Sequence, residues 1–198
     1  ITSHGMSDFF YLASQSPRRK EILDALSAPY RLLNLVEGPG ENADFDETPI
    51  PNEMPTLYVN RVSLLKASAA WRYLVDHRLE KAPVLTVDTT VTLDDKILGK
   101  PEDAEDARLM LKRLSGREHQ VLTAVTMKQG DEIHQTLSMT NVCMQSLSES
   151  NIERYIQTTE PFGKAGSYGI QGIASIFISH ISGSHSGVVG LPIYETSE

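Results

Sequence analysis

Two pairs of strand-forming segments, each pair joined by a short turn, constrain the fold of this chain more than any other feature. The run Val84 to Leu98 is interrupted at Asp94-Asp95. The runs His119 to Met127 and Glu132 to Met144 are separated by Gln129-Gly130-Asp131. Strand-forming runs separated by short polar turns predict β-hairpins, whose strands are antiparallel. The hairpins argue against a purely parallel sheet.

Helical signals alternate with these strands. A short apolar strand over Phe9 to Ala13 is followed by Ser16, a good N-cap, and by Pro17, which fits the first position of a helix. A second, long helix should begin at Pro55 or Thr56 and run toward His77. Apolar stripes are expected at Ile22, Leu23 and Leu26 of the first helix and at Tyr58, Val62, Leu65 and Ala69 of the second.

The remaining segments predict further helices, strands and loops. A helix should follow Gly99-Lys100-Pro101 and stop at Gly116. The other expected elements are a short helix opened by Ser150-Asn151-Ile152-Glu153 and running through Ile156, loops over Gly38 to Pro55 and Phe162 to Gly172, and strands over Ile173 to Ile181 and Val188 to Val189 around a turn at Ser182-Gly183-Ser184. The order predicts an α/β fold with a mixed β-sheet and flanking helices.

Composition limits the class of protein and its partners. The 198 residues, 40% of them hydrophobic, suit one compact unit or two small lobes. No apolar run approaches the roughly 20 residues that span a bilayer, so we expect no membrane partner. The net charge of −8 argues against nucleic acid as the main partner. Cys143, the only cysteine, cannot form an internal disulfide, which suits a reducing, cytoplasmic location. We interpret residues 1–5 as vector-derived and expect a single domain over residues 6–198.

The first candidate site lies between the first strand and its helix. A helix N-terminus offers free N–H groups and a dipole that favours anions. The serine hydroxyls of Ser14 and Ser16 and the guanidinium groups of Arg18 and Arg19 add further donors there. A phosphate site is one interpretation. A capped surface helix with solvated arginines is the other.

The second candidate is Asp88, which interrupts the strand-forming run after Val87. Aspartate is depleted in strands and rarely buried without a partner. Asp88 alternates with threonines on one face, which predicts that it points into a cleft or into solvent. A carboxylate beside a bound triphosphate could hold a metal or accept a proton from water. In a regular strand Asp88 and Thr89 point to opposite faces, so both could serve one site only near a strand end or bulge.

Two weaker candidates follow in the chain. Lys100 lies at a bend before Pro101 and could reach a phosphate as a point charge, although an isolated lysine in a turn is usually solvated. The segment from Gly163 to Gly172 carries Lys164 and Gln171 between glycines that allow a ligand to approach the backbone. Its spacing fits neither the Walker A motif nor the dinucleotide-binding fingerprint, and a flexible loop is the alternative.

Together these elements resemble the Maf family of nucleotide pyrophosphatases, over about residues 10–196. The resemblance rests on Leu12-Ala13-Ser14-Gln15-Ser16-Pro17-Arg18-Arg19, Asp88-Thr89, Gly99-Lys100-Pro101, Leu114-Ser115-Gly116, the segment from Lys164 to Gly172, and Val188-Val189-Gly190-Leu191-Pro192. Each motif alone is weak, and their order makes the resemblance specific.

The resemblance implies a mixed-sheet fold with two lobes around a central cleft, similar to the inosine-triphosphate pyrophosphatases. It implies hydrolysis of a nucleoside triphosphate to the monophosphate and pyrophosphate with a divalent cation, Mg²⁺ or Mn²⁺. Asp88 would be the proton acceptor, and Glu47 would help with metal or water, so both acids are candidate metal ligands. The residues expected to line the triphosphate site are Ser14, Arg18, Arg19, Lys66, Lys100 and Lys164.

Arg19, Thr89 and Gln171 resemble the branch of the family that acts on dTTP and UTP, and modified pyrimidine triphosphates remain open as substrates. A sibling branch, acting on 7-methyl-GTP, carries glutamate at the Gln171 position. Two alternatives stay open: a non-enzymatic nucleotide-binding regulator of septum formation, and a pyrophosphatase that prefers modified purines. Association into a homodimer is also left open.

Overall fold

The computed structural model describes residues 8–36 and 44–197. Residues 1–5, interpreted above as vector-derived, the expected start of the domain at residue 6, and residues 38–43 of the expected first loop therefore lie outside the described residues. Within the described part of the chain, no helix is both long enough and apolar enough to cross a membrane.

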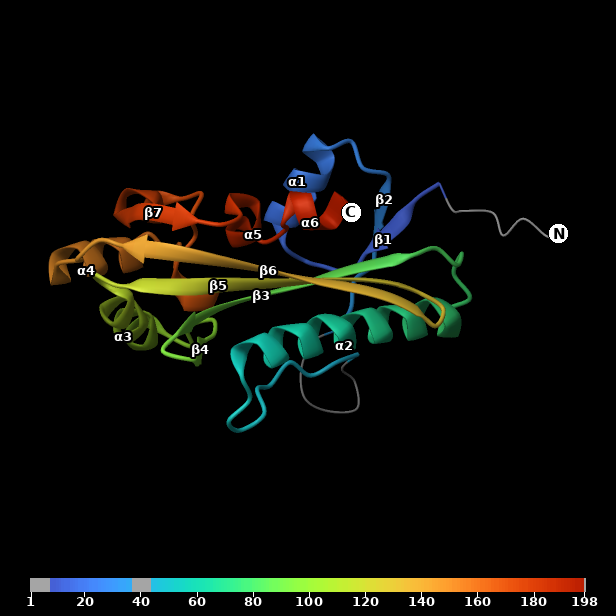
Figure 1. Ribbon diagram of the computed structural model, residues 1–198, viewed down its shortest axis with the longest axis horizontal. Coiled ribbons are helices and arrows are strands. Elements are labelled where there is room, and N and C mark those ends of the chain that lie inside the picture. The colour runs from blue at the N-terminus through green and yellow to red at the C-terminus, as the bar shows by residue number, and fades with distance from the viewer. Residues whose placement is uncertain (1–7, 37–43, 198) are drawn as a thin grey trace.

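A seven-stranded sheet, in the order β2-β1-β3-β5-β6-β7 with β4 beside β3, runs through the molecule (Figure 1). The strands β1 and β2 pair in parallel, as do β1 and β3, and the other pairs are antiparallel. The mixed α/β fold class and both hairpins are confirmed. The strands are β1 (Phe10–Leu12), β2 (Tyr30–Leu32), β3 (Val84–Leu93), β4 (Lys96–Leu98), β5 (Glu118–Gln129), β6 (Glu132–Met144) and β7 (Ile178–Ser182).

Helices cover both faces of the sheet. The long helix α2 lies along one face, and α1, α5 and α6 lie on the other, while α3 and α4 sit at the end of the long hairpin (Figure 1). The α-helices are α1 (Pro17–Ala25), α2 (Pro55–Asp76), α3 (Ala104–Leu114), α4 (Glu149–Gln157), α5 (His185–Val189) and α6 (Ile193–Ser197). Two short 3₁₀ helices are associated with the glycine-rich loop. The first, η1 (Ala165–Ser167), lies within it, and the second, η2 (Ile173–Phe177), directly follows it.

Among the described residues the core divides into four clusters, two at the ends of the sheet and two between them. At one end Leu98, α3, α4 and the glycine-rich loop pack together around Tyr155 and Tyr168. At the other end β1 packs against the C-terminal half of α2. The elements thus form two lobes that share the long strands β3, β5 and β6.

The strand β3 changes partners along one edge, and this opens the space between the lobes. On that edge Val84 and Leu85 pair with β1, whereas Val91 to Leu93 pair with β4. Among the described residues, no strand pairs with residues 86–90 on this edge, although β5 pairs with them on the other. The middle of β3 is therefore an open edge in the centre of the sheet.

Two predicted boundaries are wrong, one because a neighbouring serine caps the helix and one because a carboxylate 13 residues away binds the backbone. The helix α4 is capped by Ser148 and not by Ser150, since the Ser148 hydroxyl accepts from the Asn151 N–H at 3.1 Å. The strand expected over Ile173 to Ile181 is reduced to β7. Its first residues instead form η2, whose leading N–H groups donate to the Glu160 carboxylate.

Three further predictions are wrong. Val188 and Val189 lie in the helix α5, whose N-cap Ser184 accepts from the Gly187 N–H at 3.0 Å. Leu26 is 51% exposed because α1 ends at the residue before it. Leu65 is 37% exposed because it lies at the margin of the buried stripe of α2, whose centre is formed by residues such as Val59 and Ala70.

A buried histidine joins the sheet to the glycine-rich loop. The Nε2 atom of His119, on β5, lies 2.7 Å from the Tyr168 hydroxyl, and the two rings meet edge to face. His119 is only 3% exposed, and burial lowers the pKa of its imidazole from 6.5 to about 4. The folded protein therefore holds His119 neutral where the unfolded chain would protonate it.

This difference predicts a pH-dependent stability. As the pH falls from 7 to 5, only the unfolded state gains the His119 proton, so folding loses on the order of 2 kcal/mol from this residue. His119→Gln lacks this pH-dependent loss. The difference in unfolding free energy between wild type and variant should therefore shrink by this amount between pH 7 and pH 5. Urea titrations at both pH values measure it, with the exposed His134→Gln as the matched control. A gap that does not change with pH would contradict the buried neutral state.

Candidate active site

A cleft of about 800 Å³ lies at the open edge of β3, between the two lobes. It is lined by nine of the ten residues that the sequence predicts for the site: Ser14, Arg18, Arg19, Glu47, Lys66, Asp88, Thr89, Lys100 and Lys164. The tenth, Gln171, is exposed and lines a smaller neighbouring pocket of about 310 Å³, which shares Arg18 and Lys164 with the cleft.

The centre of the cleft is a lysine bound to two carboxylates. The Lys66 ammonium on α2 lies 2.8 Å from the Asp88 Oδ1 atom and 3.0 Å from the Glu47 Oε2 atom. Its side chain is 13% exposed and also lies 5.4 Å from the centroid of the Phe45 ring. Lys66 belongs to the buried stripe of α2. A lysine is unusual in such a stripe, so the residue pattern alone could have identified Lys66 as a candidate.

Electrostatics in this cluster follow from burial and mutual attraction. Burial would lower the pKa of Lys66, but Asp88 and Glu47 outweigh this and raise it, so the ammonium stays charged at neutral pH. Burial raises the pKa of the Asp88 carboxyl above its ordinary range, and Lys66 opposes this shift only in part. A carboxyl with a raised pKa is better suited to accept a proton near neutral pH than an exposed aspartate.

Asp88 is 7% exposed, so the interpretation as an exposed strand residue is wrong. The threonine-bearing face of β3 is covered by α2, as the 2.7 Å bond from the Thr86 hydroxyl to the Ser63 carbonyl shows. Asp88 and Thr89 both line the cleft without a bulge in the β3–β5 register. The expectation that only a strand end or bulge allows this was wrong, because an unpaired strand edge exposes both faces to one space.

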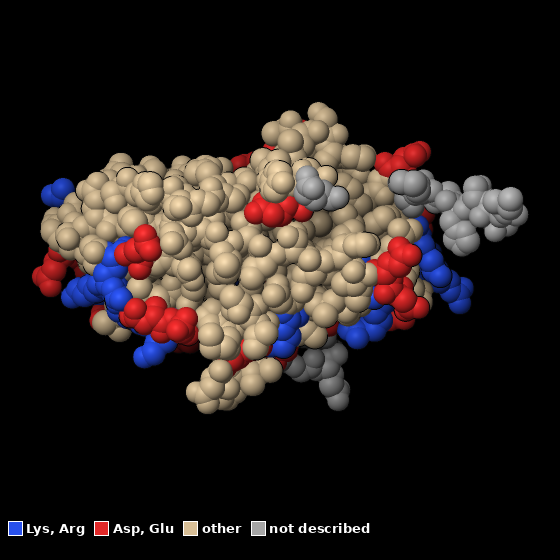
Figure 2. All heavy atoms as spheres, viewed as in Figure 1, with Lys and Arg blue, Asp and Glu red and all other residues tan. Residues whose placement is uncertain are grey.

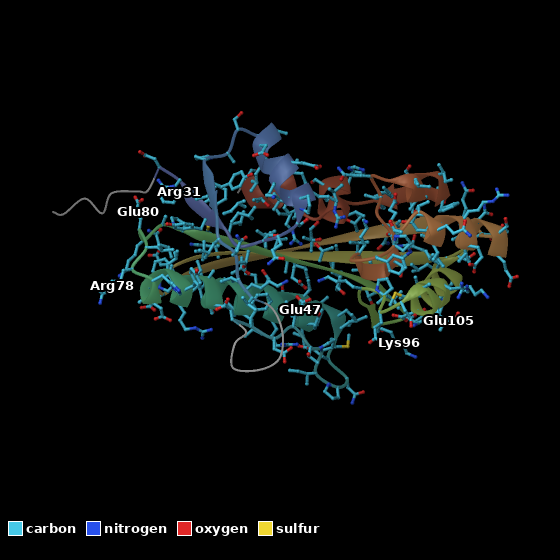
Figure 3. All side chains as sticks on the ribbon, turned by 180° about the vertical axis from the view of Figure 1, so that it is seen from behind. Arg31, Glu47, Arg78, Glu80, Lys96 and Glu105 are labelled. Atoms are coloured by element: carbon cyan, nitrogen blue, oxygen red, sulfur yellow. The ribbon has the colours of Figure 1, made fainter. Side chains whose placement is uncertain are left out.

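Glu47 reaches the cluster from the loop that precedes α2. Arg61 bonds the Glu53 carboxylate at 2.6 Å and the Thr48 carbonyl at 3.2 Å, which ties this loop to the helix. Figure 3 shows Glu47 beside α2 in the middle of the molecule, between the ends marked by Glu80 and Glu105. The other oxygen of Glu47 lies 3.4 Å from the Lys100 ammonium, whose side chain is 55% exposed.

Arg19 forms the opposite wall of the cleft. Its guanidinium donates to the Gly190 carbonyl at 2.7 Å, to the Ser14 hydroxyl at 3.0 Å and to the Thr89 hydroxyl at 3.2 Å. Burial lowers the pKa of Arg19 to about 10, so it is still charged at neutral pH. Thr123, which residue patterns did not identify, supports this wall by bonding the Thr89 hydroxyl at 3.0 Å and the Gly187 carbonyl at 2.8 Å.

The start of α1 and the glycine-rich loop supply the remaining cations. Ser16 is the N-cap residue, yet it is the Ser14 hydroxyl that accepts a backbone bond there, from the Ser16 N–H at 3.2 Å. Arg18 donates to the Val189 carbonyl at 3.2 Å. The Lys164 ammonium donates to the Glu160 carbonyl, and burial together with Arg18 lowers its pKa.

The charge balance of the cleft differs from that of the chain. Among the described residues that line it, five cationic side chains face two carboxylates, whereas the whole chain has a net charge of −8. Charged side chains of both signs gather toward the two ends and the lower margin of the face in Figure 2, and the described residues there form no continuous basic stripe. The local positive excess therefore suits a small polyanion held inside the cleft.

The motifs that meet in this cleft also place the chain among known proteins. A family model described as Maf-like protein matches residues 9–198. The chain belongs to the Maf family. The resemblance carried by the short motifs is thereby confirmed over nearly the whole chain.

Two named relatives match this chain over almost the full length of both proteins, and one solved structure matches over part of its length. The dTTP/UTP pyrophosphatase of Cupriavidus pinatubonensis is 50% identical over 192 residues, covering 97% of this chain and 95% of that protein. The dTTP/UTP pyrophosphatase of Pseudoalteromonas atlantica is 49% identical over 187 residues, covering 94% of this chain and 93% of that protein. The solved Staphylococcus aureus Ham1 protein is similar with a TM-score of 0.44 and 12% identity, over 69% of this chain and 71% of that one.

The Lys66 cluster predicts a specific pattern of stability. Lys66→Met leaves the buried Asp88 and the half-buried Glu47 without their shared cation and should cost about 3–5 kcal/mol of unfolding free energy. Adding Asp88→Asn removes one of the two charges and should recover a large part of that loss. Lys100→Met is the matched control, because its contact with Glu47 is exposed and should contribute less than about 1 kcal/mol. Urea unfolding of the four proteins measures this, and an absence of rescue by Asp88→Asn would contradict the cluster.

Proposed function

We propose that this Maf protein is a nucleoside triphosphate pyrophosphatase that converts dTTP and UTP, and modified pyrimidine triphosphates of the same shape, to the monophosphate and pyrophosphate. The carrying observation is the Lys66 ammonium bound to Asp88 and Glu47 inside a cleft lined by five cationic side chains. Relatives named dTTP/UTP pyrophosphatase at about half identity support the choice of substrates.

The residues of the cleft divide between charge neutralisation and proton transfer. Arg18, Arg19, Lys100 and Lys164 surround the space in which a triphosphate would lie, and cations there stabilise the charge that develops on the leaving pyrophosphate. The Asp88 carboxyl, with its raised pKa, would orient the attacking water and accept its proton. Lys66 keeps that carboxylate in one place.

The cofactor we propose is a divalent cation, Mg²⁺ or Mn²⁺, held by Asp88 and Glu47. Among the described residues, no group of three or more His, Cys, Asp or Glu side chains is arranged to hold a metal. Mg²⁺ is commonly held by one or two carboxylates together with substrate phosphates, and two acids within 3.0 Å of the same ammonium fit that donor set. When bound, the cation would neutralise phosphate charge.

A nucleotide-binding regulator without turnover would use the same cleft. Binding a polyanion gains nothing from two carboxylates unless they hold a metal or manage a proton, because their charge repels the phosphates. Asp88 and Glu47 at the centre of the cleft therefore favour an enzyme. A cytoplasmic location, a homodimer and the absence of a nucleic-acid partner stay predictions.

The proposal predicts pyrophosphate, and not orthophosphate, as the first product from dTTP and UTP with Mg²⁺ or Mn²⁺. Asp88→Asn keeps the size of the side chain but loses the charge, and should lower kcat by about 10²–10⁴-fold. Asp95→Asn, in the exposed turn after β3, is the matched control and should retain wild-type kcat. Ion chromatography of the products measures both. Orthophosphate as the first product would refute the function, and an Asp88→Asn enzyme retaining a tenth of kcat would remove Asp88 as the base.

Base selection is assigned to Gln171, on the wall of the smaller pocket beside the cleft. Its amide can both accept from a pyrimidine N3–H and donate to a carbonyl, whereas glutamate can only accept. Gln171→Glu should lower kcat/KM for UTP by about 5- to 150-fold and affect a guanine triphosphate less. The ratio of the two kcat/KM values measures this, with the exposed Gln129→Glu as control. An unchanged ratio would show that Gln171 does not read the base.

A further inference from the structure

The glycine-rich loop carries Lys164 and Gln171 but has little regular structure of its own. Its backbone adopts positive φ at Gly163, Gly166 and Ser167, and the 3₁₀ turn η1 is its only regular element among the described residues. A loop of this kind needs outside contacts to keep two substrate-facing side chains in fixed places.

Glu160, which precedes the loop, binds its far end. One carboxylate oxygen accepts from the Ile173 N–H at 2.9 Å, and the other accepts from the Ala174 N–H at 3.2 Å. These N–H groups begin the helix η2, where a helix has no internal partners for its first donors. The carboxylate thereby fixes the residues that directly follow Gln171 and Gly172.

The same residue also contacts the start and the middle of the loop. The Glu160 main-chain carbonyl accepts from the Lys164 ammonium. The carboxylate accepts from the Tyr155 hydroxyl at 2.8 Å, and that hydroxyl in turn accepts from the Gly169 N–H at 3.4 Å. Burial would raise the pKa of Glu160, but the bonds from Ile173, Tyr155 and Ala174 outweigh it and lower the pKa, so the carboxylate is ionised at neutral pH.

Gly172 passes directly against the Glu160 carboxylate. A Cβ atom built on Gly172 would lie 2.2 Å from the Glu160 Oε2 atom, so any larger residue would displace the carboxylate. The backbone at Gly172 has φ −100° and ψ −152°, a conformation open to alanine. Close approach to Glu160, and not backbone conformation, is therefore what requires glycine here.

We infer that Glu160 is a positioning residue for nucleotide recognition, which holds the loop 164–172 so that Gln171 faces the base and Lys164 faces the phosphates. This inference rests on the proposed function. Glu160 acts through the loop and does not need to touch the substrate. The carboxylate and the main-chain carbonyl of Glu160 have separate roles. The carboxylate binds the backbone that follows Gln171, and the carbonyl binds the Lys164 ammonium.

Glu160→Gln tests the carboxylate alone, since the shape of the side chain and the main-chain carbonyl are retained. The amide NH₂ group cannot accept, so it would face an N–H donor of η2. We expect KM for UTP to rise about 10-fold, kcat to change less than about 3-fold, and the preference for UTP over GTP to fall. Glu149→Gln on α4, whose side chain is 87% exposed, is the matched control and should leave all three unchanged.

Gly172→Ala tests the contact from the other side. Its Cβ atom should displace the carboxylate and raise KM for UTP by a similar factor. In a Glu160→Ala background the obstacle is gone, so Gly172→Ala should add less than about 2-fold. If the effects of Glu160→Ala and Gly172→Ala on KM instead multiply, as independent effects do, the inference is wrong. This test holds even if Glu160→Gln folds poorly.

Hydrogen exchange separates this inference from the function on which it rests. Without nucleotide, the amides of Ile173 and Ala174 should exchange faster in Glu160→Gln than in wild type. If they do, while KM and the UTP preference stay at wild-type values, Glu160 has only a structural role and the inference is wrong. If wild type releases no pyrophosphate from UTP, the proposed function has failed, and the exchange rates then show whether the Glu160 contact itself exists.

Discussion

The cleft brings a buried and a half-buried carboxylate together, and a cation between them offsets their mutual repulsion. Asp88 and Glu47 come from a strand and from a loop, and both lie within 3.0 Å of the Lys66 ammonium on α2. Leaving either acid charged and unpaired in this environment would cost several kcal/mol, so the positions of three separate segments become linked. The Arg61 contacts with Glu53 and Thr48 extend this linkage along the loop that carries Glu47. The cluster is thus a structural constraint and, in the proposed function, also the reactive centre.

The sheet supplies the space in which that cluster can act. Because β1 and β4 pair with opposite ends of one β3 edge, the middle of that edge is left open between the two lobes. Asp88 then faces α2 while Thr89, on the opposite face, bonds Arg19 at 3.2 Å, and both border the same cleft. Cations from α1, from the bend at Lys100 and from the glycine-rich loop complete the walls. A small polyanion can therefore be surrounded by charge in a protein that is acidic overall.

Local sequence patterns predicted the structure correctly where no other interaction competed for the same backbone groups. The hairpin turn at Asp94-Asp95 and the start of α1 at Pro17 were predicted correctly. Asp88 lies in a cleft, one of the two positions that its pattern predicted. Predictions failed where distant residues decide the backbone. Glu160 accepts the N–H groups that would have continued a strand through Ile173. The cap of α4 failed for a local reason, because Ser148, two residues before Ser150, forms the capping box with Asn151. Lys66 was identified from the family resemblance, although its place in the buried stripe of α2 was a usable signal. Its two carboxylate partners are 19 and 22 residues away, and no periodicity reveals them. The side chain of Gln171 borders the smaller pocket instead of the cleft, a separation that motif spacing does not contain.

A crystal structure with Mn²⁺ and a UTP analogue whose α–β bridge resists hydrolysis would test the central claim, that Asp88 and Glu47 form the reactive centre of a triphosphate site. The account predicts an anomalous manganese peak within coordination distance of both carboxylates and of the phosphates, about 2.0–2.6 Å for oxygen ligands of such cations. It further predicts the phosphates among Arg18, Arg19, Lys100 and Lys164. Manganese held by phosphates alone, with both carboxylates still bound only to Lys66, would contradict the account.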